Sequence, residues 1–366
     1  MNNKKNILLC PLDWGIGHAT RCVPLIKKLI KNDANVIIAA DKRPLAFLKR
    51  EFPNLKFINL SGYNISYSRK GNMVLKTLLS IPKILFGIYK EHKLLKYIIN
   101  IYNIDVVISD NRYGMWNKNI KSIFITHQIM IKCPKSIKFI EFFLFHLSKF
   151  FITKYDECWV PDYKGSINLS GDLSHKYKTP SNTYFIGPLS RFCSDNNKSL
   201  EHKIKYDLLV ILSGPEPQRT ILEEEILYQL NNKCSKLNTV ITRGITEEDK
   251  QYNISENIKV FSHLESEKMK YYIQSSNLIV CRPGYSSIMD IIALGKNAVF
   301  IPTPGQTEQE YLSEYYLNKN MFFSTPQNNL NLMNAIKQSD YYSGTSFNIN
   351  YNEDIFNKRI KALLNN

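Results

Sequence analysis

Three side chains that can exchange protons follow expected strands in the first half of the chain. His18 lies in the Gly-rich turn DWGIGHATR, Asp110 ends the run IDVVISD, and His127 follows the run SIFIT. Loops at the carboxyl ends of parallel strands are where such sites are built, so we expect these groups to converge. An imidazole or a carboxylate placed there can take a proton from a hydroxyl group. The alternatives are structural: a histidine that caps its own helix, and an aspartate that shapes a turn.

The decapeptide CRPGYSSIMD, residues 281–290, has the features of an anion-binding turn. It lies between an apolar run typical of a buried strand and an apolar helical pattern. Its Pro-Gly pair interrupts regular structure, and Ser286 or Ser287 can cap the helix that follows. Free N–H groups and the helix dipole at such a helix start attract an anion. Asp290 is expected about one turn inside the helix, close to that anion.

Two more polar turns follow expected strands in the second half. The turn LSGPEPQRT offers backbone N–H groups and Arg219 to a phosphate. The segment PTPGQTEQEY directly follows the strand AVFI, and its amides and carboxylates suit a ligand rich in hydroxyl groups. A Pro/Gly loop before a polar helix start would explain the composition alone. Three such turns at one expected sheet edge favour a binding site.

Apolar strands alternate with helical segments along the chain, and this pattern predicts an α/β fold around parallel sheets. Each half opens with a strand, a Gly-containing turn and a helix, which is typical of nucleotide-binding domains. The expected strands are 6–10, 36–40, 56–59, 105–109, 122–126, 157–160, 183–186, 206–212, 238–242, 258–261, 278–280 and 298–301; the expected helices are 21–31, 73–102 and 220–231. Ligands of such sheets bind at the carboxyl ends of the strands, and a cleft between the halves is the default site.

The length of 366 residues exceeds what one hydrophobic core usually supports, so two domains are expected. The polar segment SRFCSDNNKSLE, residues 190–201, is the best linker. We therefore expect domains at 1–190 and 201–345. A final helix over 346–366 can pack back on the first domain.

The net charge of +16 predicts an anionic partner. Nucleic acid is not expected, because the chain has no recognition motif for it. Two Lys-containing apolar stretches, 73–102 and 137–155, are candidates for lying on an anionic membrane surface; the alternative is a helix packed on the sheet with its lysines outward. Seven scattered cysteines without metal spacing indicate a reducing, cytoplasmic setting, with attachment to the inner face of the membrane as a further expectation.

A family resemblance rests on VCRPGYSSIMDIIALGKNAVFIPTPGQTEQEYLSE. This segment resembles the nucleotide-sugar-binding region of GT-B glycosyltransferases, and most closely family 28, the group of the peptidoglycan lipid-linked N-acetylglucosaminyltransferase. The positions that keep the family's order and spacing are Gly284, Asp290, Gly295, Pro302, Gln309 and Glu310. The turn GIGHATRCVP is similar to the Gly-Gly-His loop of this group, and LSGPEPQRT is similar to its second phosphate loop.

The resemblance implies two Rossmann-like domains whose parallel sheets face an interdomain cleft. It also implies a transferase that moves a hexose or N-acetylhexosamine from a nucleotide sugar, a UDP-sugar in the first instance, to a hydroxyl of a glycan or lipid-linked acceptor. Inversion at the anomeric carbon, no cofactor and no metal are expected, and the sequence has no Asp-x-Asp pair. An epimerase of the same fold and a non-catalytic nucleotide-sugar-binding protein are the alternatives.

Residue roles also follow from the resemblance. Asp290 would bind the ribose, Gln309 and Glu310 the donor sugar, and the segment around Phe261 the base. The full implied donor site is Ser213, Gly214, Arg219, Phe261, His263, Arg282, Gly284, Ser286, Ser287, Asp290, Gln306, Gln309 and Glu310. His18 would be the base on the acceptor side, with Asp110 as its rival. Gly15, Gly17 and His127 would bind the acceptor or a phosphate.

Overall fold

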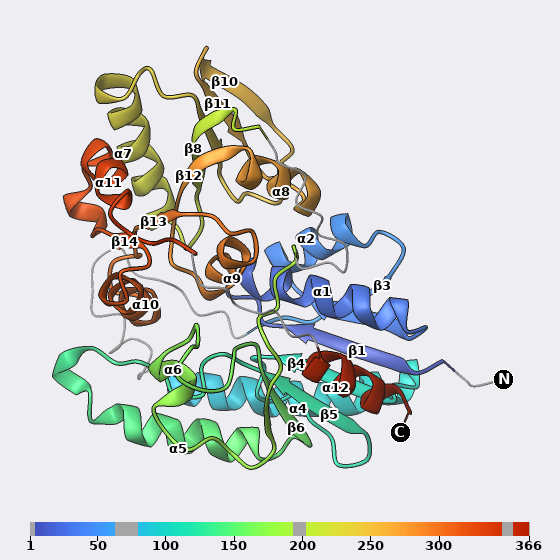
Figure 1. Ribbon diagram of the computed structural model, residues 1–366. Coiled ribbons are helices and arrows are strands. Elements are labelled where there is room, and N and C mark those ends of the chain that lie inside the picture. Colours follow the sequence, from blue (N-terminus) through green and yellow to red (C-terminus); the bar gives the residue numbers. More distant parts are fainter. Residues whose placement is uncertain (1–3, 63–79, 193–202, 346–353, 366) are drawn as a thin grey trace. The chain divides into compact units, whose positions relative to one another are not determined.

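The computed structural model describes residues 4–62, 80–192, 203–345 and 354–365, and the chain separates into two units (Figure 1). The first unit runs to Leu189 and also includes the C-terminal helix. The second unit starts at Ser190. Most of the expected linker, and the first residues of the helix expected over 73–102, lie outside the described residues.

The first unit is a parallel sheet with helices on both faces. Its strands occur in the order β3-β2-β1-β4-β5-β6-β7. In chain order its elements are β1 Asn6–Pro11, α1 Gly17–Lys31, β2 Asn35–Ala40, α2 Lys42–Glu51, β3 Lys56–Asn59, α4 Ile81–Tyr102, β4 Val106–Asp110, β5 Lys121–Ile125, η1 Lys135–Ile137, α5 Ile140–Ile152, β6 Glu157–Val160, α6 Asp172–His175, β7 Thr183–Phe185 and α12 Asp354–Asn365. Strands buried on both faces read as continuous apolar runs, as β1 and β2 do.

Alternate residues of each strand point to opposite faces of the first sheet and build two cores. Ile7 and Leu9 of β1 pack with α1, α2 and α12, whereas Leu8 and Cys10 pack with α4. α5 covers β5 and β6 on the α4 side of the sheet (Figure 1). The C-terminal helix α12 therefore completes the core of the first unit, and α4 and α5 share the other face.

The second unit repeats this architecture. Its sheet has the order β10-β11-β9-β8-β12-β13-β14, and only the described edge strand β10 runs antiparallel to its neighbour. Its elements are β8 Tyr206–Ile211, α7 Gln218–Lys233, β9 Thr239–Thr242, β10 Gln251–Ser255, β11 Ile258–Phe261, α8 Ser266–Gln274, β12 Ser276–Cys281, α9 Tyr285–Ala293, β13 Ala298–Phe300, α10 Thr307–Asn318, β14 Phe323–Ser324, η2 Gln327–Asn329 and α11 Leu332–Ser339. α7 and α11 pack on one face of this sheet, and α8 and α9 lie on the other (Figure 1).

The expected strands are confirmed, while some helix boundaries and two short strands were not anticipated. α1 begins at Gly17 rather than at residue 21, so His18 belongs to its first turn. β10 and β14 were missed: all five residues of β10 are exposed, and β14 has two residues. None of the helices in the described residues has the length and apolar character needed to cross a bilayer.

Candidate active site

His18 and Asp110 come together at the carboxyl edge of the first sheet. His18 lies in the first turn of α1, which follows β1, and Asp110 is the last residue of the adjacent strand β4. The Nδ1 atom of His18 lies 2.7 Å from Oδ1 of Asp110. A carboxylate is an acceptor, so Nδ1–H donates to it and the lone pair remains on Nε2. Nη2 of Arg21 lies 2.9 Å from the same Nδ1, but it donates to Oδ1 of Asp110 instead. The side chain of His18 is 14% exposed, whereas that of Asp110 is fully buried.

Arg21, one helical turn after His18, holds Asp110 from the other side. Its Nε donates to Oδ2 of Asp110 at 2.5 Å, and its Nη2 forms an ion pair with Oδ1. Its Nη1 lies 2.7 Å from Nδ1 of His127, which accepts this hydrogen bond. His18, Arg21, Asp110 and His127 therefore form one network at the carboxyl ends of β1, β4 and β5.

The electrostatics of this network keep Asp110 ionised. Burial by itself raises the pKa of the Asp110 carboxyl. The charge of Arg21, and the hydrogen bonds that Arg21 and His18 donate, outweigh burial and hold this pKa well below its usual range. A buried, permanently charged carboxylate fixes the ring and the tautomer of His18 but has no open surface of its own. The structural alternative for His18 is not what is observed, because no side chain in the described residues caps α1.

The turns predicted to bind the donor lie in order along one edge of the second sheet. β11, β9, β8, β12, β13 and β14 are neighbours in that order and run parallel, so the loops after them share one edge. Phe261 ends β11 and His263 follows it. Ser213 and Gly214 follow β8, the segment 281–290 follows β12, and the segment 302–311 follows β13. The residues assigned to base, diphosphate and sugar thus succeed one another across the sheet.

The backbone of the β8 turn selects glycine at position 214. Its φ of +101° favours glycine, whereas a Cβ atom there would make an ordinary van der Waals contact, 3.4 Å from Oγ1 of Thr303 in the β13 turn. Arg219, predicted to bind the diphosphate, instead forms ion pairs with Glu216 and Glu223, the latter at 2.8 Å. Its guanidinium braces the turn and the first turns of α7, so a phosphate would have to compete with two carboxylates for it.

The start of α9 differs from the expected cap. The helix begins at Tyr285 after Gly284, and no side chain in the described part of the chain caps it. Ser286 and Ser287 therefore lie inside the first turn, and the expectation that they cap the helix is wrong. Asp290 is buried and accepts hydrogen bonds from Ser190 Oγ at 2.7 Å and Arg191 Nε at 3.0 Å. Burial raises the pKa of Asp290, although Arg191 and Ser190 counteract it.

Arg282 holds loops together. Its guanidinium is buried and donates to the carbonyl groups of Ile301, Pro302 and Gln218 and to the side chain of Gln327. Burial lowers the pKa of Arg282 to about 10. These contacts fix the turn after β13 against the start of α7. Arg282, predicted to contact the donor, would therefore act on it only indirectly, by holding these loops in place.

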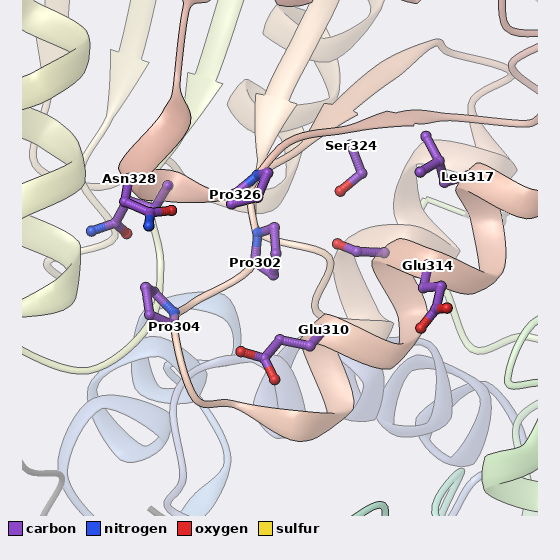
Figure 2. Close-up of a pocket in the computed structure, with 10 residues that line it drawn as sticks. Pro302, Pro304, Glu310, Glu314, Leu317, Ser324, Pro326 and Asn328 are labelled. Atoms are coloured by element: carbon purple, nitrogen blue, oxygen red, sulfur yellow. The ribbon is translucent and has the colours of Figure 1, made fainter. Parts of the chain in front are cut away.

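The turn after β13 is held by the two residues predicted to bind the donor sugar. Gln309 accepts from the N–H of Thr303 and Glu310 from the N–H of Gly305, each at 2.8 Å. Gln306 immediately precedes α10 and occupies its N-cap position. Glu310 also lines a cavity of about 540 Å³ between α10 and the segments after β13 and β14 (Figure 2). The sheet edge therefore carries open space next to a predicted sugar contact.

Comparisons with known proteins agree with this architecture. Residues 209–341 match the glycosyltransferase family 28 C-terminal domain, and residues 6–122 match a glycosyl transferase family 1 model. An uncharacterized glycosyltransferase of Methanosarcina acetivorans is 22% identical over 334 residues, which cover 85% of this chain and 84% of that protein.

Solved structures share the fold over nearly the whole chain. The glycotransferase of kitacinnamycin has a TM-score of 0.59 at 12% identity, covering 100% of this chain and 95% of its own. The calicheamicin glycosyltransferase CalG4 has a TM-score of 0.58 at 10% identity, covering 99% and 94%. SnogD from Streptomyces nogalater has a TM-score of 0.59 at 9% identity, covering 99% and 95%.

Two α/β units with parallel sheets, each with polar turns at one sheet edge, together with these matches define the chain as a glycosyltransferase of the GT-B fold. Its C-terminal part, residues 209–341, is the part that matches the glycosyltransferase family 28 C-terminal domain.

Arg21 and Thr303 were missed in the sequence analysis. The cavity wall formed by the segment after β14 was missed as well. Arg21 follows His18 by three residues, a spacing that places both on one face of a helix. That signal was present in the sequence but became visible only once the helix was known to begin at Gly17. Thr303 is buried, and its hydroxyl has no hydrogen-bond partner in the described residues.

Proposed function

We propose that this enzyme transfers a sugar from a UDP-sugar to a hydroxyl group of a lipid-linked acceptor, with His18 as the general base. The observation that carries the proposal is the 2.7 Å contact between Nδ1 of His18 and the buried, ionised Asp110. It leaves Nε2 of a partly exposed imidazole as the proton acceptor. Asp110 acts through His18: it orients the ring and stabilises the imidazolium that forms.

The reaction is a single displacement. The acceptor oxygen attacks the anomeric carbon and loses its proton to His18 as the bond between that carbon and the diphosphate breaks. Negative charge develops on the leaving diphosphate, and backbone N–H groups at the start of α9 and in the β8 turn stabilise it. Attack opposite to the leaving group inverts the anomeric configuration.

A radioactive transfer assay tests the reaction class. The enzyme is incubated with a panel of UDP-sugars labelled in the sugar and with vesicles made from total lipid of the source cells. Label should move into the lipid fraction, and the His18→Gln variant should lose this transfer. Label recovered as an epimerised UDP-sugar, or only as free sugar in water, would contradict the proposal and indicate an epimerase or a hydrolase.

An exposed apolar face formed by α4 and α5 supports the proposal that the acceptor is lipid-linked. The two helices meet where Ile84 of α4 and Phe151 near the end of α5 both pack, with Tyr113, against Leu12 and Ile88. The face carries half of the exposed large apolar side chains among the described residues. They are Leu85, Phe86, Tyr89, Leu94, Tyr97 and Ile101 on α4, and Phe139, Phe142, Phe143, Leu147 and Phe150 on or beside α5. We name this surface the α4/α5 face.

Charge on the α4/α5 face has one sign. The carboxylates of the two helices, Glu91 and Glu141, are buried and bound by Arg112 and Lys176 at 2.8 and 2.7 Å. The exposed charges are lysines: Lys83, Lys90, Lys93 and Lys96 on α4, and Lys135, Lys138 and Lys154 beside α5. Aromatic side chains flanked by lysines suit the interface of an anionic bilayer. We therefore propose that the enzyme docks peripherally through this face, on the cytoplasmic side of the membrane.

Vesicle sedimentation tests the docking. The enzyme should bind vesicles that contain anionic lipid, less at high salt, and changing Phe142, Phe143 and Phe150 to serine should abolish binding. A matched control changes three exposed apolar residues of the second unit, Ile221, Tyr228 and Met333, to serine and should bind normally. Equal binding to neutral and anionic vesicles at every salt concentration would refute the docking surface.

A further inference from the structure

The cavity next to Glu310 is lined by groups whose polarity and charge can select between donor sugars. It measures about 540 Å³, within the usual range for small-molecule pockets. One wall is a face of α10 that carries Glu310, Ser313, Glu314 and Leu317, which are spaced so that they share one side of the helix. The opposite wall is formed by segments after β13 and β14, among them Pro302, Pro304 and Pro326 (Figure 2).

The described polar side chains of the cavity are two carboxylates, two hydroxyls and two amides: Glu310 and Glu314, Ser313 and Ser324, and Gln327 and Asn328. Glu310 points toward the loop that carries Pro302 and Pro304, and Glu314 follows one turn later on α10 (Figure 2). Ser313 lies between them in the sequence; it is 5% exposed, and its hydroxyl has no hydrogen-bond partner in the described residues. A buried hydroxyl without a partner beside a cavity indicates a ligand that completes it. The proline rings and Leu317 offer apolar surface to the carbon face of a ring.

The charge of the cavity is negative. Glu310 and Glu314 are carboxylates, and no lysine, arginine or histidine is among its lining residues as described. A ligand group seated there gains from hydroxyl or ammonium donors and is repelled if it carries a carboxylate. The preference for uncharged or positively charged groups comes from the negative charge of Glu310 and Glu314, and high salt weakens it.

The position of the cavity along the sheet edge identifies the part of the donor that would enter it. The turns after β8 and β12 are the predicted diphosphate site, and the turn after β13 carries Gln309 and Glu310. The cavity lies between the β13 and β14 turns, one step further from β8. The group next to the diphosphate, on the side away from the base, is the sugar.

We infer that this cavity is a selectivity pocket for the donor sugar, in which Glu314 and Ser313 contact the far side of the ring and exclude acidic sugars. The inference rests on the proposed function, because it presumes a nucleotide-sugar donor. It assigns the donor to neutral or amino-bearing hexoses and excludes hexuronic acids. Glu314 is the specificity-determining residue, since Glu310 is already held by the N–H of Gly305.

The experiment compares donors that differ only in charge at carbon 6. Affinities are measured by calorimetry for UDP, for UDP-glucose against UDP-glucuronate, and for UDP-N-acetylglucosamine against its uronate. The wild-type enzyme should bind each uronate at least about tenfold more weakly than its neutral partner. Glu314→Gln and Glu314→Lys should reduce that ratio by about threefold or more, and Ser313→Ala should weaken the neutral sugar. Glu224→Gln, an exposed carboxylate of α7, is the matched control and should leave the ratio unchanged.

The outcomes separate this inference from the proposed function. If UDP binds but each uronate binds as tightly as its neutral partner, or if Glu314→Lys leaves the ratio unchanged, the selectivity pocket is refuted and the transferase proposal stands. If neither UDP nor any UDP-sugar binds, the proposed donor is wrong and the inference falls with it.

Discussion

Replacing His18 by glutamine separates the chemical step from binding and folding. Glutamine can still donate a hydrogen bond to Asp110, but it has no basic nitrogen. Loss of a general base costs about 10²–10⁴-fold in kcat, equivalent to roughly 2.7–5.4 kcal/mol of barrier. The donor contacts predicted above are all in the second unit, so the KM for the donor should stay within about threefold of wild type.

The comparison with Asp110→Asn makes this prediction sharper. Asp110 is fully buried between His18 and Arg21, so removing its charge leaves a buried guanidinium unpaired. That change should lower the free energy of unfolding by about 3–5 kcal/mol, whereas His18→Gln should change it by less than about 1 kcal/mol. Because Asp110 acts through His18, the double variant should be no slower than the slower single variant.

Steady-state transfer assays on the three variants, with unfolding in guanidinium as the measure of stability, decide the matter. A His18→Gln enzyme that retains kcat within about tenfold of wild type would refute the assignment of His18 as the base. Independent, multiplicative effects of the two changes on kcat would refute the claim that Asp110 acts through His18.

Two further changes test the packing around the site. Because the pKa of Asp110 is depressed, its stabilising contribution is present above its unfolded value of about 3.9 and is lost as the pH falls below that value towards the folded pKa; Arg21→Met should therefore lower the free energy of unfolding by about 3–5 kcal/mol at pH 7 and by less at pH 3. Equal losses at the two pH values in chemical denaturation would contradict this. Gly114→Ala should destabilise by roughly 1–3 kcal/mol, because a Cβ there would lie 2.3 Å from the carbonyl oxygen of Ile88; an unchanged unfolding midpoint would show that α4 can move away.

The fold could be predicted from sequence because its central strands are buried on both faces. The runs VIIAA in Asn35–Ala40 and LIVC in Ser276–Cys281 are continuous and apolar, and their length distinguishes them from helices. β10 has no such signal: its residues are all exposed, and pairing with β11 alone defines it. The start of α1 was placed late because glycines in the turn GIGH resemble a loop until the helix continues from them.

The sequence predicted which turns form the site, but it did not predict which contacts their side chains make. Because β1 and β4 are parallel neighbours, the residues that follow them lie at one sheet edge whatever their side-chain conformations. The proximity of His18 and Asp110 could therefore be predicted from the strand pattern. The partners of Arg219 and Asp290 depend on side-chain direction within α7 and on residues 190–191, which are 100 and 99 positions before Asp290. Nothing in one sequence fixes such long-range pairs.

The central claim is that the second unit binds a nucleotide sugar at the carboxyl edge of its sheet. The most direct measurement is the free energy of unfolding with UDP, GDP, ADP and dTDP, for the wild type and for Asp290→Ala, each compared with its own ligand-free baseline. UDP at about a hundredfold excess over its Kd should stabilise the wild type by about 2.7 kcal/mol, and the Asp290→Ala variant by clearly less. No stabilisation by any nucleoside diphosphate would contradict the donor site and, with it, the proposed reaction.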